Sequence, residues 1–219
     1  MSRLLVCVIL AAALAGCSLP KRASGPLPVG APQTVDGLIA AIQADSARSD
    51  AATDGKAREQ LADEASSYAD ACVAQAPQAA PCLYGKGLAL GLEARAHPTG
   101  ANDALKSMLQ ALGSAEAADP NYDQAGPSRV RALVLLRAPG WPLGPGDPDA
   151  GLVAARRAVE LKPQYPPNLL ALAEALSKTE DSKGALDAYA KARDAAQALP
   201  AGPDRDGWIR EAEQGLRKK

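Results

Sequence analysis

The sequence predicts an all-α protein, and three features of its composition favour that fold class. Alanine, the strongest helix former, accounts for 49 of the 219 residues. Phe is absent, aromatic residues make up only 3% of the chain, and Val and Ile together number 13. Because β-sheets favour β-branched and aromatic side chains, this composition argues against a sandwich, a barrel or a parallel-sheet enzyme.

The charge balance and the scarcity of reactive side chains exclude further classes of function. Lys and Arg number 24 and Asp and Glu number 25, which leaves a net charge of −1. No basic excess is present to neutralise phosphates, so we expect no nucleic-acid partner. The chain has one His and four Cys, which is little material for a metal site or a catalytic triad. We therefore expect no metal, no cofactor and no catalytic residue.

The first residues have the pattern of an export signal. Arg3 precedes an apolar run at residues 4–14, which fits the hydrophobic region of a secretory signal and is too short to span a bilayer. The run ends in the tetrapeptide LAGC at residues 14–17, which resembles the lipobox of bacterial lipoproteins. That resemblance implies a signal peptide over residues 1–16 and a Cys17 acylated with fatty acids such as palmitate. The alternative is an ordinary secretory signal with an incidental Cys.

The lipoprotein resemblance also implies a location. In the enterobacterial sorting rule, the residue after the acylated Cys decides the membrane, and here it is Ser18 rather than Asp. We therefore expect a lipid anchor in the outer membrane, with the protein facing the periplasm. Residues 17–33 contain four Pro and two Gly and predict a tether. At about 3.1 Å per residue, a Pro-rich segment over 18–33 would reach roughly 50 Å.

The clearest repeat is a 34-residue unit at residues 166–199. Its first half carries an apolar stripe at helical spacing, a polar turn follows at 178–183, and its second half has a small–aromatic–small pattern. This pattern resembles a tetratricopeptide repeat, in which small residues let two antiparallel helices approach while larger residues fill the flanks. The residues that carry the pattern are Leu169, Leu172, Ala173, Leu176, Ala185, Tyr189 and Ala192.

The same repeat is found less completely towards the N-terminus. Gly151, Ala155 and Ala158 lie 34 positions before the second-helix residues of that unit, and Pro163 ends their helix. A loop of Pro and Gly separates it from a helix predicted over 122–137. The resemblance implies an α-α superhelix of tetratricopeptide-like hairpins over 34–219. Further helices are expected near 35–48, 57–76, 81–96 and 101–118, with a capping helix at 204–217.

A narrower resemblance comes from the segments at 131–142, 146–148, 155–161 and 165–168. They are similar to lipoproteins associated with TRAP transporters. Those are periplasmic tetratricopeptide proteins that are thought to work with extracytoplasmic solute-binding proteins. The resemblance implies a protein partner of that kind, or a role in the uptake of a small organic acid.

Two cysteines of the exported part are candidates for a disulfide. Cys72 lies near the end of one predicted helix and Cys82 at the start of the next, with Pro77 and Pro81 in the turn between them. Exported proteins form such bonds, and closing this loop would stabilise the fold by about 2.5–3 kcal/mol. The alternative is two small buried side chains at a helix crossing.

Candidate binding residues lie around the Pro/Gly loop. Trp141 lies between Gly140 and Pro142, and Trp is enriched at binding hot spots on loops. The alternative is that Trp141 folds back over the helix before it. Asn168 is expected at a helix N-terminus, facing the concave surface. Tyr165 is a further candidate. Arg129, Arg131 and Arg137 could together line a groove for an acidic partner, and the alternative is that they lie on solvated helix faces.

These observations together predict a binding protein rather than an enzyme. We expect a membrane-anchored periplasmic scaffold or adaptor that holds a protein or peptide on its concave surface by shape complementarity. The main alternative is a TRAP-associated component that helps the uptake of an organic-acid-type solute. An assembly role in the outer membrane also stays open, while a cell-wall hydrolase would need a pocket with perturbed carboxylates.

Overall fold

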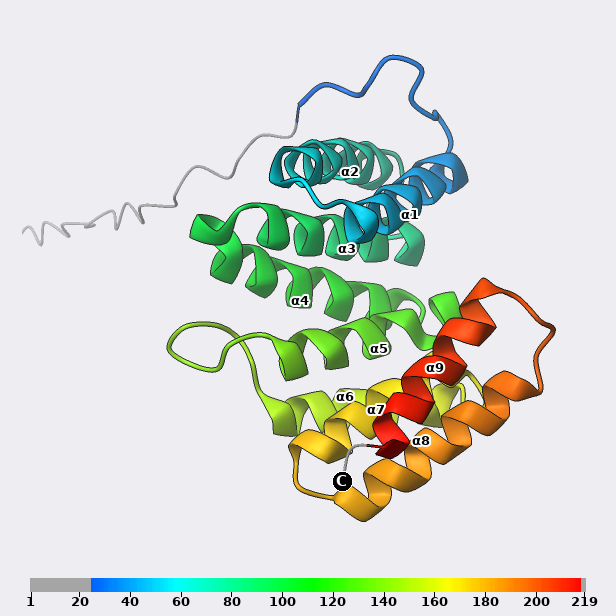
Figure 1. Cartoon of the computed structure of the whole chain (residues 1–219). Helices are drawn as coiled ribbons and strands as arrows, with labels where there is room; N and C mark the ends of the chain where they lie inside the picture. Colours follow the sequence, from blue (N-terminus) through cyan, green and yellow to red (C-terminus); the bar gives the residue numbers. More distant parts are fainter. Residues whose placement is uncertain (1–24, 218–219) are drawn as a thin grey trace, which may run out of the picture.

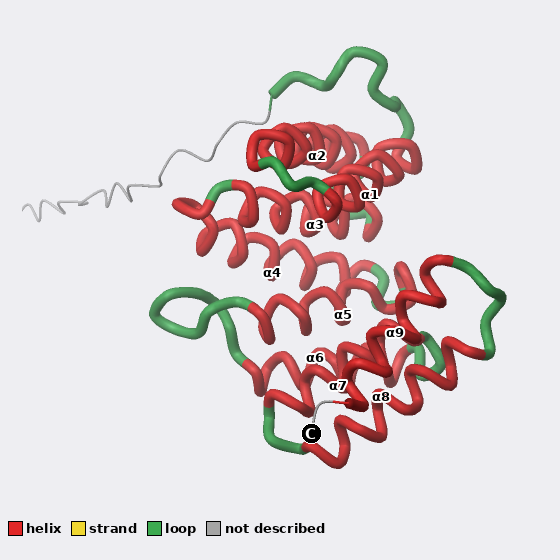
Figure 2. The backbone as a smooth tube through the Cα atoms, in the orientation of Figure 1, coloured by secondary structure: helices red, strands yellow, loops and turns green. Residues whose placement is uncertain are grey.

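The computed structural model describes residues 25–217 as a series of antiparallel helices (Figures 1 and 2). Within that range it has nine α-helices, a short 3-10 turn at Pro98–Gly100 and no strand. This confirms the predicted all-α superhelix. The helices are α1 (Val35–Ala51), α2 (Gly55–Gln75), α3 (Ala80–Ala96), α4 (Ala101–Ala118), α5 (Tyr122–Arg137), α6 (Pro148–Leu161), α7 (Pro166–Lys178), α8 (Ser182–Gln197) and α9 (Pro203–Arg217).

The helices form two layers. Consecutive helices pair as the hairpins α1–α2, α3–α4, α5–α6 and α7–α8, and α9 packs on the last hairpin as the expected cap. The odd-numbered helices also contact one another from hairpin to hairpin, whereas the even-numbered ones do not. We call the odd-numbered helices the inner layer, because helices that approach one another across repeats lie on the concave side of a curved array.

Small residues lie where the helices of a hairpin cross. The alanines predicted at these crossings, among them Ala155, Ala173 and Ala185, are all buried. In the α3–α4 hairpin the same purpose is served by Gly87, where a Cβ would lie 2.9 Å from Cδ2 of Leu112. A larger side chain at these positions would push the two helices apart, so the alanine excess of the sequence has a packing function.

The beginning of α5 differs from the helix predicted over 122–137. Asp123, Gln124 and Ala125 have φ values of 47°, 55° and 64°, so they form one left-handed turn. The right-handed helix starts after them, with Pro127 in its first turn, where a missing backbone N–H costs nothing. Left-handed geometry costs about 1–2 kcal/mol for each of these residues, so other contacts must hold the turn in place.

The described part of the predicted tether lies against the body of the protein. Ser67 Oγ of α2 donates a hydrogen bond to the carbonyl oxygen of Gly25, at 3.0 Å, and Ala31 packs on the first core cluster. The expected reach of roughly 50 Å is therefore too long. Only residues 18–24 separate Cys17 from this contact, and seven residues extend at most about 25 Å. Cys17 and the predicted signal at 1–16 lie outside the described residues.

None of the described helices is both long and apolar enough to cross a lipid bilayer.

The predicted disulfide is present between α2 and α3. The Sγ atoms of Cys72 and Cys82 are 2.02 Å apart, and both residues are completely buried. The bond closes the turn between the two helices and lies in the core cluster that also includes Leu38, Ile42 and Leu92. It therefore joins the first hairpin to the second through the centre of the N-terminal core.

We expect reduction of this disulfide to destabilise the protein by about 2.5–3 kcal/mol, because the unfolded chain regains the freedom of a closed loop whose ends are 10 positions apart. Thermal unfolding with and without dithiothreitol measures the effect. The Cys72→Ala/Cys82→Ala variant should unfold at the same temperature in both buffers. An unchanged unfolding temperature of the wild type on full reduction would contradict the expectation.

A second prediction concerns the buried carboxyl of Asp45 in α1. Burial, and then the nearby charge of Glu64, raise the pKa of Asp45 above its usual value, although Arg48 pairs with it at 2.9 Å. The native state then holds its proton more tightly than the unfolded state, so stability should fall as pH rises from about 4 through the raised pKa. Asp45→Asn should remove this loss in denaturant titrations across pH, whereas Asp187→Asn on the exposed face of α8 should retain it.

Candidate functional site

Two grooves open on the inner layer, each between inner helices and with an outer helix as its floor. The first, the polar groove, has a volume of about 830 Å³ and lies between α5, α7 and α9 over the first half of α8. The second, the apolar groove, has a volume of about 460 Å³ and lies between α3 and α5 over α4. Arg137 lines both grooves, so they adjoin at the C-terminal end of α5.

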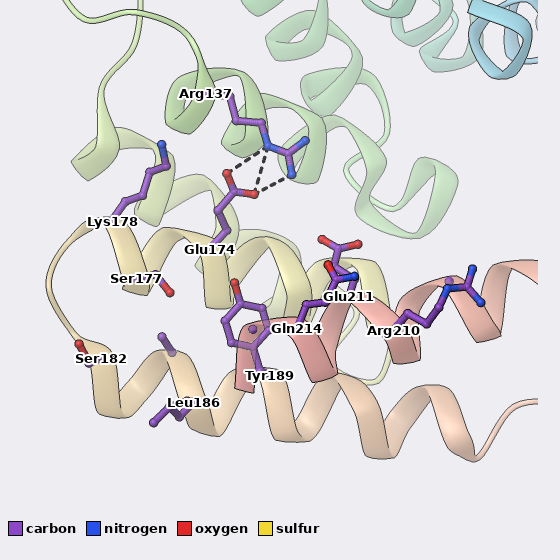
Figure 3. Close-up of a pocket in the computed structure, with 13 residues that line it drawn as sticks. Arg137, Glu174, Ser177, Lys178, Ser182, Leu186, Tyr189, Arg210, Glu211 and Gln214 are labelled. Carbon is purple, nitrogen blue, oxygen red and sulfur yellow. Dashed lines mark hydrogen bonds and ion pairs between the residues drawn. The ribbon is translucent and has the colours of Figure 1, made fainter. Parts of the chain in front are cut away.

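Charged side chains from α5, α7 and α9 line the polar groove (Figure 3). The guanidinium of Arg137 binds the carboxylate of Glu174 with both ends of its fork, at 2.6 Å from Nη2 to Oε2 and 3.0 Å from Nε to Oε1. The hydrogen bonds that Arg137 donates to Glu174 raise the pKa of Arg137 above its usual value. Lys178 and Arg210 line the same groove and have no ion-pair partner among the described residues. Together with Glu211, the groove carries three cations and two carboxylates.

Neutral groups complete the polar groove. Tyr189 projects from the floor helix α8, where burial raises the pKa of its hydroxyl, so that it stays protonated near neutral pH. Ser177 and Gln214 add a hydroxyl and an amide from α7 and α9. These groups can donate and accept hydrogen bonds beside the charged side chains, a combination that suits a polar or anionic ligand.

The apolar groove has a different chemistry. Its lining comes from Leu88 and Leu92 of α3, Met108 of α4, and Val130 and Leu133 of α5. Two arginines stand at its edge, and each already has a carboxylate partner: Arg95 pairs with Asp50, and Arg137 with Glu174. The groove therefore offers an uncharged surface, closed at one end by the beginning of the loop that follows α5.

That loop, residues 138–147, presents Trp141 to solvent. The side chain of Trp141 is 90% exposed and that of Leu143 is 77% exposed, so the interpretation that Trp141 covers the end of α5 is wrong. The Trp141–Pro142 peptide bond is cis. In Figure 1 the loop stands out from the body between α5 and α6.

Backbone hydrogen bonds hold this loop in one shape. The N–H of Gly146 donates to the carbonyl of Pro139 at 2.8 Å, and the N–H of Asp147 donates to Leu135 at 2.9 Å. A Cβ at Gly146 would collide with the carbonyl oxygen of Ala138, so only glycine fits this crossing. The loop therefore projects from the end of α5 in a shape that backbone hydrogen bonds at its base hold in place.

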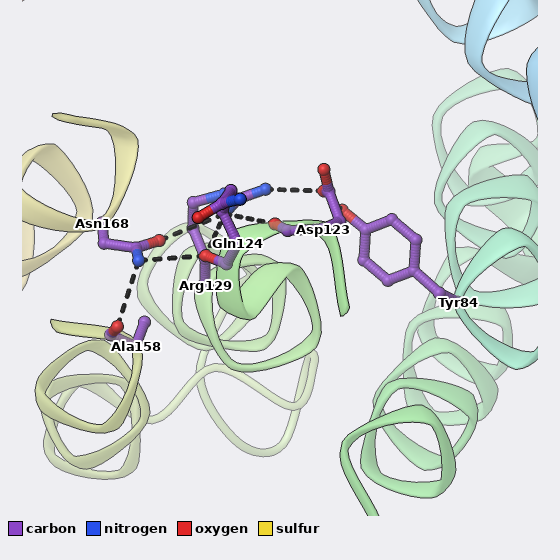
Figure 4. Close-up of polar contacts among 6 residues, drawn as sticks. All are labelled: Tyr84, Asp123, Gln124, Arg129, Ala158 and Asn168. Carbon is purple, nitrogen blue, oxygen red and sulfur yellow. Dashed lines mark hydrogen bonds and ion pairs between the residues drawn. The ribbon is translucent and has the colours of Figure 1, made fainter. Parts of the chain in front are cut away.

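Asn168 lies in the first turn of α7, close to the predicted helix N-terminus, but its side chain lies in the interior rather than on the concave surface (Figure 4). The helix begins two residues earlier, and the side-chain amide of Asn168 donates to the carbonyls of Ala158 and Gln124, each at 3.0 Å. Its Oδ1 accepts a hydrogen bond from Nη1 of Arg129 at 3.1 Å. Since the side chain is completely buried, its function is to connect α5, α6 and α7.

Arg129 is the centre of this polar network. Its Nη2 binds Oδ2 of Asp123 at 2.8 Å, and its Nη1 donates to the carbonyls of Asp123 and Gln124, both at 3.2 Å. The hydroxyl of Tyr84 in α3 donates to the same Asp123 Oδ2 at 2.8 Å. Burial, and then the charge of Asp123, raise the pKa of Tyr84 well above its usual value. These bonds hold the left-handed turn that opens α5.

Tyr165 belongs to the edge of the same network. The guanidinium carbon of Arg129 lies 5.2 Å from the centre of the Tyr165 ring, a cation–π contact. The Tyr165 ring meets that of Trp208 edge to face, with 5.7 Å between their centres. Tyr165 therefore ties α9 to the network and lies outside both grooves.

The structure thus separates the residues that the sequence grouped as binding candidates. Arg137 lines both grooves and Trp141 lies on the exposed loop, whereas Asn168 and Tyr165 support the fold. Of the other two arginines, Arg129 is buried in the network, and Arg131 pairs with Glu116 at 3.6 Å, outside both grooves. The two grooves therefore take only one of the three arginines, Arg137.

Apart from Arg137, the sequence does not single out the residues that make the polar groove. The sequence pattern places Lys178 in a turn, Arg210 on a capping helix and Tyr189 at a packing position. The sequence does offer one signal for this groove, because α9 is unusually polar. A helix that only caps the last hairpin needs apolar rather than polar residues on the side that faces the body. Within residues 25–217 no three potential metal ligands lie together.

Comparisons with known proteins identify the architecture. No protein-family profile matches the chain, and no curated protein sequence matches it. Among solved structures, it is similar to a thermophilic tetratricopeptide-repeat protein of Thermus thermophilus, with a TM-score of 0.54 and 21% sequence identity. The match covers 82% of this chain and 91% of that protein. The fold is a tetratricopeptide-like superhelix. The similarity shows the fold of this chain and nothing of its ligand.

We expect Asn168→Leu to lower the free energy of unfolding by about 2–3 kcal/mol, because it removes one hydrogen bond to the charged Arg129 and two from the buried amide to backbone carbonyls. Chemical denaturation measures the change. The control is Arg131→Met, which removes a more exposed ion pair and should cost less than about 1 kcal/mol. Equal effects of the two substitutions would show that the network is not a stabilising centre.

Proposed function

We propose that this protein is a lipid-anchored periplasmic scaffold that binds a protein or peptide partner in the polar groove of its inner layer. The observation that carries this proposal is a groove of about 830 Å³ lined by two cations, Lys178 and Arg210, that pair with no carboxylate among the described residues. Repeat superhelices use such concave surfaces for binding, and this groove lies where the last repeat meets its cap.

The chemistry of the groove favours an acidic segment of the partner. Lys178 and Arg210 add positive charge, whereas Arg137 is held by Glu174 in one orientation and offers its remaining donors without a further loss of side-chain freedom. Tyr189 and Gln214 can hydrogen-bond to the backbone of a bound chain. Recognition of this kind rests on charge and shape, and it requires no covalent step.

The membrane anchor is the second part of the proposal. The LAGC tetrapeptide supports acylation at Cys17, and Ser18 supports the outer membrane. The contact between Ser67 and Gly25 supports an arrangement in which the first hairpin stays within about 25 Å of the bilayer surface. A partner bound by the inner layer would then be held close to that membrane.

A second candidate function is that of a TRAP-associated component that takes a small organic acid. The volume of the polar groove lies within the range of about 300–1,000 Å³ that is typical of small-molecule sites, and its cations suit a carboxylate. The groove is wide for a ligand of that size. The absence of a narrow apolar passage in its lining favours the macromolecular partner over the solute.

The test is affinity capture from detergent-solubilised membranes of the native host. We expect Lys178→Gln/Arg210→Gln to reduce recovery of the partner about tenfold or more, since two charge-assisted contacts are lost, and added salt to weaken capture by the wild type. Lys183→Gln/Lys191→Gln, which removes two positive charges from α8 outside the groove, serves as the control.

Capture that is equal for the groove variant and the control, or no partner at all, would contradict the scaffold proposal. Calorimetric titration with small mono- and dicarboxylic acids tests the second candidate. Binding that is abolished by the groove variant and not by the control, together with no captured protein, would favour the solute function.

A further inference from the structure

The exposed loop after α5 has an unusual surface for its position. Residues 138–146 include no charged side chain, and Trp141 and Leu143 present their apolar surfaces to solvent. A Trp side chain buries roughly 150–250 Å² when it finds a partner, which makes it a strong anchor for association. Because backbone hydrogen bonds already fix the loop, its docking would cost little further ordering.

The apolar groove lies directly beside this loop. Its rim includes Ala138 and Pro139, the first two residues of the loop. The rest of its lining is apolar except for Ser46 of α1 and two arginines, each of which is paired with a carboxylate. The loop cannot fill its own groove, because the bond from Gly146 to Pro139 folds it back on itself with Trp141 outside. Each molecule therefore carries an uncharged exposed loop directly beside the apolar groove.

We propose that the apolar groove binds Trp141 and Leu143 of a second copy of this chain, and that the two copies exchange these loops in a two-fold symmetric dimer. In a two-fold symmetric dimer, the loop of each copy can enter the apolar groove of the other copy when loop and groove are neighbours on the same chain. The loop and the apolar groove of this chain are such neighbours. The proposal goes beyond the scaffold function, and it leaves the polar groove free.

The charge of each groove determines which of the two proposed occupants fits it, the loop of a second copy or the acidic segment of a partner. An acidic segment gains from Lys178 and Arg210, whereas the loop is uncharged and matches the neutral lining of the apolar groove. The guanidinium groups of Arg95 and Arg137 at the groove edge can also pack against an indole ring. With a net charge of −1, two copies repel each other little.

The expected interface is small. Two reciprocal insertions of Trp141 and Leu143, with the groove walls that they cover, bury on the order of 1,000 Å², the lower limit for a specific interface. We therefore expect a reversible dimer that forms at micromolar concentrations.

Sedimentation equilibrium of the lipid-free chain from residue 18 onwards, which retains every described residue, tests the proposal between about 1 and 200 µM. The wild type should shift from monomer to dimer across this range. Trp141→Ala/Leu143→Ala, which changes exposed residues only, should raise the dissociation constant at least tenfold, and Leu133→Asp in the groove should do the same. Val153→Ala, at an exposed apolar residue outside both grooves, is the matched control and should dimerise like the wild type.

Mixing the two defective variants gives a sharper result. The loop variant keeps an intact groove and the groove variant keeps an intact loop, so their mixture should form a heterodimer through one of the two contacts, while each alone stays monomeric. In a Trp208→Phe background Trp141 is the single Trp, and its fluorescence should move to shorter wavelength as the dimer forms. Circular dichroism confirms that each variant is folded.

Four outcomes would overturn the proposal. The first is a wild type that stays monomeric up to 200 µM, and the second is a dimer that survives both sets of substitutions. The third is a monomer whose Trp141 fluorescence shifts only on addition of phosphatidylethanolamine–phosphatidylglycerol vesicles, which would assign the loop to a lipid surface. Loss of dimer in the loop variant but not in Leu133→Asp would likewise exclude the groove.

Discussion

The ion pair of Arg129 with Asp123 is the constraint on which the rest of the array depends. Repeat proteins are usually held together by contacts between neighbouring repeats alone. Here one guanidinium fixes a left-handed turn, meets Asn168 of the next hairpin and supports the ring of Tyr165. Through Asp123 it also reaches Tyr84 in the preceding hairpin. Three consecutive hairpins and the cap therefore share one buried polar centre, which makes their unfolding cooperative.

The grooves lie at the boundaries of the inner helices. The helices α3 and α5 approach each other less extensively than any other pair of neighbouring inner helices. The space left between them, over Met108, is the apolar groove. The polar groove arises at the other boundary, where α9 crosses the last hairpin. Binding surfaces thus lie where the repeat is interrupted rather than where it is regular.

The helices were predictable because each has apolar residues at helical spacing and is followed by residues that end a helix. The ranges agree with the structure to within three residues, and Pro163 follows the end of its helix as expected. The turn at Asp123 was not predictable, since neither the residue types nor Pro127 distinguish it from an ordinary helix start. Its geometry is imposed by Arg129 and by Asn168, 39 residues further on. The grooves were missed for a similar reason: their charged residues meet only after three helices have packed.

Arg137 stands in the wall between the two grooves, and this position has a thermodynamic consequence. A ligand that draws the guanidinium away from Glu174 in one groove also changes the charge and shape of the rim of the other. If both are occupied, each ligand must alter the affinity of the other by the same factor, whichever binds first. The orientation of this one side chain would then link partner binding in the polar groove to self-association through the apolar groove.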